Sequence, residues 1–222
     1  MLAETLISPF LPAAHPQASV QELLAHMQRF NVLQLPVVDG TTYLGNVARM
    51  HLELLNAPED LLQPHLAELP LQQVSVHARQ HFFEVVELMN THQQTLVAVL
   101  DDAGSYLGAI TQLEVVRNLT ALTAADEAGF VLVLEMPRQD YSLTEIASIV
   151  EGSNARILSL YMSPVPEGRN MYVNLKITGE VPAPIVLSFQ RFGYEVAFVF
   201  SSAEQAADTQ ERFDALMRYL NI

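Results

Sequence analysis

Thr111 and Glu114 stand three residues apart where an apolar, strand-like pattern gives way to a helical one. A hydroxyl can donate and accept hydrogen bonds, and a carboxylate can accept from two neighbouring hydroxyl groups at once. The first turn of a helix also presents free backbone N–H groups, which favour an anion such as phosphate. Side chains of these types at a helix start could therefore meet a ligand that carries hydroxyl or phosphate groups, and they lie, with Gln112 between them, within the run Gly108-Ala109-Ile110-Thr111-Gln112-Leu113-Glu114.

The same pattern occurs once more, 63 residues earlier, where Gly45 takes the place of Gly108. There Ala48, Arg49 and His51 stand in for Thr111, Gln112 and Glu114. Upstream the match continues at an offset of 62, where His77 pairs with His15, and we add His77 to the candidates. A repeat of this size indicates one supersecondary unit used twice. We expect the two copies to pack on each other and to form two related clefts.

Each copy is predicted to run helix, strand, strand, helix after a short extended segment. In the first copy Ser19 and Glu22 resemble a capping box that starts a helix. Strands are expected at 35–38 and 43–47, and a second helix from about 49 to before Pro58. In the second copy the equivalent elements are a helix from about 82, strands at 95–100 and 106–110, and a helix carrying Leu113 and Val116, followed by a linker or frayed helix end at 120–129.

The pattern changes after residue 129. Strands are expected at 130–136, 157–162, 171–177 and 194–200, with helices that begin at a second capping box, Ser142 to Glu145, and near Ile185. The order βαββαβ is that of the ferredoxin-like motif. A final helix is predicted from the stripe Phe213, Leu216, Met217 and Leu220, as core or dimer contact.

Composition excludes several classes of function. The 222 residues carry 11 basic and 25 acidic side chains, a formal charge of −14, so the basic footprint of a nucleic-acid-binding protein is absent. The same charge disfavours acidic membrane surfaces, and no apolar run approaches the ~20 residues that cross a bilayer. The N-terminus lacks the pattern of a secretory signal. No cysteine is present, which favours a reducing, cytoplasmic setting.

No combination of residues indicates catalysis or a metal site. The chain has no motif around any Ser, His and Asp set and no glycine-rich phosphate loop of the usual spacing. His77 and His81 would share a helix face if the helix began early enough, but two histidines without a third ligand make a poor metal site. We therefore expect neither enzymatic activity nor a bound metal.

Residues 1–120 resemble a tandem pair of CBS motifs. The resemblance rests on the doubled Gly-apolar-apolar-Thr-x-x-Asp pattern, seen as 45–51 and 108–114, and on the strand Leu35-Pro36-Val37-Val38-Asp39. It implies that the clefts bind an adenine nucleotide or adenosyl ligand such as AMP, ADP, ATP or S-adenosylmethionine. In the family the Asp bonds the ribose hydroxyls and the Thr bonds phosphate or ribose.

This chain departs from that pattern in both copies. Glu114 replaces the Asp with one more methylene, and Thr111 is kept, so the second half-site is the better candidate. In the first copy Ala48 cannot donate a hydrogen bond, and neutral His51 offers one bond in place of a two-hydroxyl clamp. Arg49 could pair with a phosphate or be solvated. The alternative is a CBS pair retained as a scaffold with degenerate clefts.

Residues 130–200 resemble an ACT domain, on the runs 140–146, 156–160 and 192–196. The layout is similar to CBS–ACT regulators of the acetoin-utilisation type. The resemblance implies amino-acid binding near a glycine in the loop between the first strand and helix, but Tyr141 stands there and blocks a close backbone approach. The candidate residues of this loop and helix end are Asp140, Tyr141 and Asn154.

The sequence thus predicts an α/β (α+β) protein: CBS motif 1 at 1–59, CBS motif 2 at 60–124 with internal pseudo-twofold symmetry, and a ferredoxin-like, ACT-like domain at 125–222. We expect a non-catalytic regulatory sensor, in which nucleotide binding to the CBS pair is coupled to the ACT domain or to an unknown protein target. The alternatives are a dimerisation scaffold and an amino-acid sensor. Both modules tend to self-associate by resemblance, and an unpaired sheet edge gives a reason, so a homodimer is expected.

Overall fold

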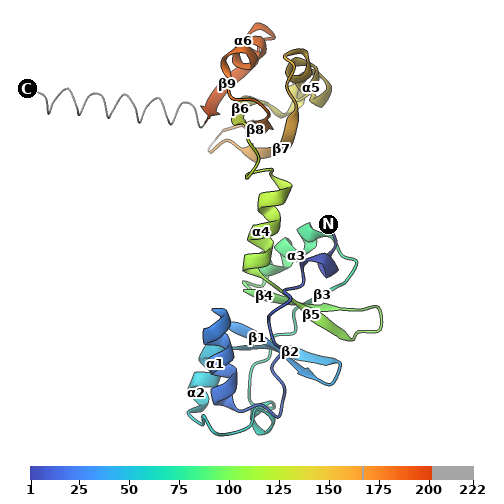
Figure 1. The fold of residues 1–222 in the computed structure, drawn as a ribbon, viewed down its shortest axis with the longest axis vertical. Coiled ribbons are helices and arrows are strands. Elements are labelled where there is room, and N and C mark those ends of the chain that lie inside the picture. The colour runs from blue at the N-terminus through green and yellow to red at the C-terminus, as the bar shows by residue number, and fades with distance from the viewer. Residues whose placement is uncertain (167, 202–222) are drawn as a thin grey trace, which may run out of the picture. The chain divides into compact units, whose positions relative to one another are not determined.

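The computed structural model describes residues 1–166 and 168–201, and the chain divides into two compact units, Met1–Asn118 and Leu119–Ile222. The predicted stripe from Phe213 to Leu220 lies outside the described residues. Within the described ranges, no helix has both the length and the apolar character that a membrane span requires. Both units combine helices and sheets, as the sequence predicts, and Figure 1 labels their elements.

The first repeat packs two helices against a two-stranded antiparallel sheet. Helix α1 begins after Ser19, whose Oγ accepts a hydrogen bond from the Glu22 N–H at 3.2 Å, and it buries Val20, Leu23 and Met27. It ends at Asn31, whose φ of 51° is left-handed. The elements are η1 (Ala3–Leu6), α1 (Val20–Phe30), β1 (Gln34–Asp39), β2 (Thr42–Ala48) and α2 (Arg49–Leu55).

The second repeat has the same order with one addition, the short strand β3, which pairs in parallel with β4. Gln93 ends the turn after α3 with the same φ of 51° as Asn31, and both hairpins contain an irregularity of register one residue before the repeated glycine. The predicted duplication is therefore confirmed. Helix α4 continues to Leu122, into the stretch predicted as a linker. The elements are η2 (Gln63–His65), β3 (Ser75–His77), α3 (Phe82–Thr91), β4 (Leu96–Leu100), β5 (Tyr106–Thr111) and α4 (Gln112–Leu122).

Two short segments, 7–8 and 71–72, cross from one repeat to the other, and we call them the crossing segments. The Ser8 N–H donates to the Ala109 carbonyl at 2.9 Å, on β5 of the second repeat. The Gln72 N–H donates to the Asn46 carbonyl at 3.1 Å, on β2 of the first repeat. Asn46 and Ala109 are equivalent positions, so the segment that precedes each repeat lies on the opposite one. This exchange gives residues 1–118 their pseudo-twofold symmetry.

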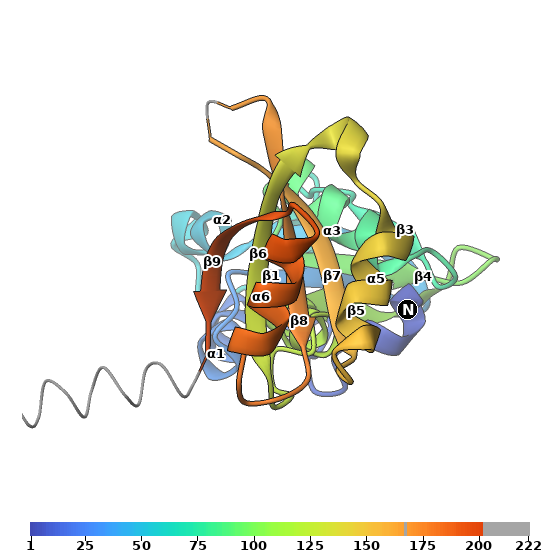
Figure 2. The ribbon, with the colours of Figure 1, turned by 90° about the horizontal axis from the view of Figure 1, so that it is seen from above.

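The second unit has the βαββαβ order, with strands arranged β7-β8-β6-β9 and every neighbouring pair antiparallel. Helices α5 and α6 lie on one face of this sheet (Figure 2) and enclose a core that includes Leu134, Ile146 and Phe189. The predicted ferredoxin-like topology is confirmed. The elements are β6 (Phe130–Pro137), η3 (Arg138–Asp140), α5 (Leu143–Gly152), β7 (Ile157–Pro164), β8 (Asn170–Ile177), α6 (Ala183–Arg191) and β9 (Glu195–Phe200).

Helix starts differ from the sequence prediction in detail. Ser142, like Ser19, accepts the expected hydrogen bond from the backbone, in this case from the Glu145 N–H at 3.3 Å. The Glu145 carboxylate accepts from the Tyr194 hydroxyl and not from the backbone of Ser142, so this capping box is incomplete. The complete capping box is at His81 and Glu84, at the start of α3. His81 is thus a helix cap and His77 ends β3, so the idea that they share a helix face is wrong, because α3 begins only at Phe82.

The close approach of the crossing segments should make stability sensitive to a methyl group added at the glycine beneath them. A Cβ on Gly45, whose φ is +132°, would lie 2.8 Å from the Leu71 Cβ, so we expect Gly45→Ala to lower the free energy of unfolding by about 2–4 kcal/mol, from backbone strain and overpacking together. Gly40 is the control, because its φ is +61° and its surroundings are open. Gly40→Ala should cost only about 1 kcal/mol. Equal losses in urea titrations would contradict a close approach at Gly45.

Candidate functional site

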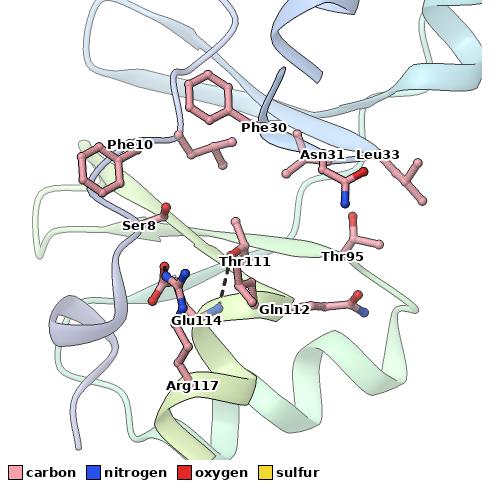
Figure 3. A pocket seen from close by; sticks show the side chains of 13 residues that line it. Ser8, Phe10, Phe30, Asn31, Leu33, Thr95, Thr111, Gln112, Glu114 and Arg117 are labelled. Carbon is pink, nitrogen blue, oxygen red and sulfur yellow. Dashed lines mark hydrogen bonds and ion pairs between the residues drawn. The ribbon is translucent and has the colours of Figure 1, made fainter. Parts of the chain in front are cut away.

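A cleft of about 530 Å³ opens beside the start of α4, and its walls come from both repeats. Thr111, Gln112 and Glu114, predicted together from the sequence, lie on one side (Figure 3). The rings of Phe10 and Phe30 lie across the cleft from Glu114 in the same view. The remaining lining residues lie in or shortly after the first crossing segment, just after α1, just before β4, and in α4: Ser8, Leu11, Asn31, Val32, Leu33, Thr95, Leu113 and Arg117.

Thr111 and Glu114 already have partners within the chain. The buried Thr111 Oγ1 accepts a hydrogen bond from the Glu114 N–H at 3.3 Å and so caps α4, while its own proton remains available to donate. The Glu114 side chain is 16% exposed, and its Oε1 lies 2.9 Å from Nη1 of Arg117, which is 62% exposed. The cleft therefore contains a carboxylate, that of Glu114, paired with the solvent-exposed guanidinium of Arg117.

The equivalent positions of the first repeat have different chemistry. Ala48 precedes α2 and makes no side-chain cap. Arg49 pairs with Glu53 along the surface of α2 at 2.8 Å, as a solvated arginine would. His51 is half-buried, and its Nδ1 has no hydrogen-bond partner among the described residues. These three candidates do not line the cleft at Thr111.

The structure does not bring His77 to the cleft. His77 is exposed at the end of β3, where its backbone N–H donates to the Gln80 Oε1 at 2.6 Å. Gln112 is exposed at the start of α4, and its Nε2 donates to the Gln94 carbonyl at 3.4 Å. Gln112 therefore joins the second repeat's own loop to its helix while it lines the cleft.

Sequence reasoning missed the opposite wall of the cleft. Ser8, Phe10, Phe30 and Thr95 lie outside the repeated signature, and the crossing that brings Ser8 to β5 has no local sequence mark. Arg117 could have been found, because it stands three residues after Glu114 on the same helix, a spacing at which side chains meet.

The second unit has a separate hollow of about 330 Å³ beside the loop between β6 and α5. Asp140 lines it, together with Glu145 and Tyr194. Tyr141 packs on the core and Asn154 is exposed in a left-handed turn after α5, and neither lines the hollow. The three residues predicted for amino-acid binding are therefore not brought together around it.

Tyr194 and Glu145 form the best-defined polar contact of that hollow. The Tyr194 hydroxyl donates to the Glu145 Oε2 at 2.8 Å. Burial, followed by this hydrogen bond and the carboxylate's negative charge, raises the pKa of Tyr194 to about 12. The contact joins α5 to the start of β9. Across residues 1–166 and 168–201, no cluster of three or more acidic or histidine side chains is arranged to hold a metal ion.

Residues 3–52 match the family model of the CBS domain. The match extends from η1 into α2 and so spans the first repeat, with β1, β2 and their hairpin. It confirms the predicted CBS motif there, and the second repeat has the same order of elements with the strand β3 in addition.

Solved CBS structures are similar over about half of the chain. A CBS domain pair/ACT domain protein from Thermotoga maritima is 20% identical, with a TM-score of 0.47, over 54% of this chain and 96% of that chain. CBSX2 from Arabidopsis thaliana is 20% identical, with a TM-score of 0.47, over 57% of this chain and 98% of that chain. A structure of CBSX2 in complex with AMP is 20% identical, with a TM-score of 0.46, over 53% of this chain and 95% of that chain.

The cap at Thr111 gives a test of its structural role. Thr111→Val removes the acceptor of the Glu114 N–H, so we expect the free energy of unfolding to fall by about 1 kcal/mol, while Thr111→Ser should lose less. Ala48→Thr supplies the missing cap at the equivalent position and should raise stability. Urea unfolding of the three variants checks the order, and a Thr111→Ser variant as weak as Thr111→Val would contradict capping.

The raised pKa of Tyr194 predicts how stability changes in alkali. The unfolded chain loses this proton near pH ~10, whereas the folded chain retains it to about pH 12. The contribution is therefore complete below pH ~10 and is lost as the pH rises toward about 12. In urea titrations at increasing pH, we expect Tyr194→Phe to remove the part of the loss of unfolding free energy that comes from this side chain. An unchanged pH dependence would contradict it.

Proposed function

We propose that this chain is a non-catalytic regulatory protein whose residues 1–124 form a CBS pair that binds an adenine nucleotide or adenosyl ligand. The ligand occupies the cleft at Thr111 and Glu114, and motif 1 (1–59) and motif 2 (60–124) each contribute one wall. Residues 125–222 form an ACT-like domain or interaction module that responds to it.

The cleft itself is the observation that carries this proposal. Its volume of about 530 Å³ lies within the ~300–1,000 Å³ usual for small-molecule sites. It combines two aromatic rings, Phe10 and Phe30, with a hydroxyl, a carboxylate and a guanidinium at one helix start. A nucleotide needs all of these: an apolar surface for a base, an acceptor for sugar hydroxyls and a positive charge for phosphate.

Each polar side chain then has a defined task. Glu114 accepts from the ribose hydroxyls, and its pairing with Arg117 places the guanidinium close to the same ligand. Arg117 extends into solvent and can pair with a phosphate through the guanidinium N–H groups that Glu114 does not occupy. Thr111 donates its remaining proton while it keeps the α4 cap.

Helix α4 offers the route by which binding is read out. It begins at the cleft and continues to Leu122, past the division between the two compact units at Asn118 and Leu119. A ligand that favours one arrangement of the α4 start changes the population of states of that helix, and the free-energy coupling is reciprocal. We infer a homodimeric, cytoplasmic protein as its setting, on the acidic, cysteine-free composition and on the self-associating modules that the sequence resembles.

A second candidate function is an interaction scaffold without a ligand. It is favoured by one observation: the Thr111 hydroxyl and the Glu114 carboxylate are already engaged within the chain. An amino-acid sensor has less support, because Tyr141 and Asn154 lie away from the hollow that Asp140 lines.

Thermal unfolding with AMP, ADP, ATP, S-adenosylmethionine and amino acids separates these candidates. A ligand at about 100 times its dissociation constant should add about 2.7 kcal/mol of stability. Glu114→Gln removes the charge of a bonded acceptor, worth about 1.5–3 kcal/mol, so binding should weaken roughly 10- to 100-fold.

Glu53→Gln is the matched control, because Glu53 also pairs with an arginine, Arg49, along a helix surface, but outside the cleft. It should leave nucleotide affinity unchanged in calorimetric titrations. A shift that survives Glu114→Gln places the site elsewhere, and no shift with any of these ligands favours the scaffold.

A further inference from the structure

Because the two repeats are related by pseudo-twofold symmetry, the cleft at Thr111 has a symmetry-related counterpart. Its walls are found from the residues that make equivalent backbone hydrogen bonds in the two repeats. Val32 and Gln94 are equivalent, because their N–H groups donate to the equivalent carbonyls of Met27 and Met89 at 3.0 and 2.9 Å. Ser8 and Gln72 are equivalent in the two crossing segments. We call the position walled by Gln72, Gln94, Ala48 and His51 the twin cleft.

We call the cleft at Thr111 the open cleft. Shorter side chains line the open cleft at the positions where long amide side chains span the twin cleft. Gln94 Nε2 donates to Gln72 Oε1 at 2.7 Å, which joins the crossing segment to the start of β4. At the equivalent positions of the open cleft stand Ser8 and Val32, and both line its space. A hydrogen-bonded bridge therefore runs across one cleft, at the place where the other is hollow.

A third glutamine completes this bridge from the first repeat. Gln34 Nε2 donates to Gln94 Oε1 at 3.1 Å and to Gln72 Oε1 at 3.3 Å. Gln34 is 8% exposed and Gln94 is 2% exposed, so these amides are buried and satisfied by one another. Gln72 itself is exposed, so the two buried amides carry the closure: breaking the bond between Gln34 and Gln94 would remove the partner of a buried polar group, which opposes opening of the bridge.

We propose that the Gln34–Gln72–Gln94 bridge closes the twin cleft, so that each chain takes one adenine nucleotide, in the cleft at Thr111. The proposal rests on the proposed function for its ligand, but the closed state of the twin cleft does not depend on any ligand. Ala48 and His51 fit this state, because a closed cleft needs neither the hydroxyl nor the carboxylate.

The same bridge also positions a wall of the open cleft. Gln34 Oε1 accepts from the backbone N–H and from Oγ1 of Thr95 at 3.1 and 2.9 Å, and Thr95 lines the open cleft. Gln34 is thus a positioning residue, and closure of one cleft holds a lining residue of the other.

Side-chain amide exchange tests closure without any ligand. In the full chain, the Gln34 and Gln94 side-chain N–H groups should exchange with solvent at least about tenfold more slowly than those of exposed Gln21 and Gln28 on α1. Exchange as fast as at Gln28 would overturn the closed bridge, whatever the protein binds.

Calorimetric titration with AMP tests the number of sites. We expect the wild-type chain and the Ala48→Thr/His51→Glu variant each to bind one AMP per chain, because the variant gains the site chemistry but no room. Adding Gln72→Ser and Gln94→Val copies the residues of the open cleft, and this fourfold variant should bind two.

Two kinds of result count against closure. Two AMP molecules on the wild type, or on the twofold variant alone, would show that the glutamines leave the twin cleft open. A folded fourfold variant that still binds one would show that they are not what closes it. No AMP binding by the wild type would instead contradict the proposed function, and amide exchange would still decide the state of the bridge.

Discussion

The close passage of each crossing segment over a glycine is the contact on which the N-terminal unit depends. Gly45 lies under Leu71 and Gly108 under Ile7, with no room for a Cβ at either position. The backbone bonds from Ser8 to β5 and from Gln72 to β2 require this approach. Without the exchange, each repeat would be a small sheet with two helices and an uncovered face, too small for a stable core. The exchange also gives each cleft a wall that its own repeat cannot supply.

Backbone symmetry and side-chain asymmetry therefore coexist in this unit. Both repeats keep the same left-handed turn, the same hairpin irregularity and the same crossing bond. The side chains at equivalent positions have diverged as sets: a short hydroxyl, an apolar residue and a carboxylate on one side, two amides and a histidine on the other. The amides are constrained together, because each of the three glutamines satisfies another. A change at Gln34 or Gln94 would leave a buried amide of the other without one of its partners.

Much of the fold could be predicted because its signals are local or periodic. The constant offset between the runs 45–51 and 108–114 predicted the duplication, and alternating apolar residues from Met171 to Ile177 predicted strand β8. The cleft was only half predictable. Thr111 and Glu114 belong to the repeated run, but Phe10, Phe30 and Thr95 reach them through long-range packing with no sequence period. The His81 cap was missed because an imidazole nitrogen, not a hydroxyl, accepts the Phe83 N–H. The glutamine bridge was missed because the sequence does not show which glutamines are buried or which groups their amides contact.

Electrostatics at the cleft work against the field of the whole chain. A formal charge of −14 repels an anionic nucleotide at long range, so approach is slowed except where salt screens the charge. At contact the balance differs, since Glu114 is held by Arg117 and the pair adds no net charge to the cleft. In the proposed function, a phosphate would be attracted to the exposed guanidinium at short range, while the carboxylate would accept from neutral hydroxyl donors. In the proposed function, Arg117 is what would let an acidic residue serve an anionic ligand, and both side chains stand on α4, the helix that begins at the cleft.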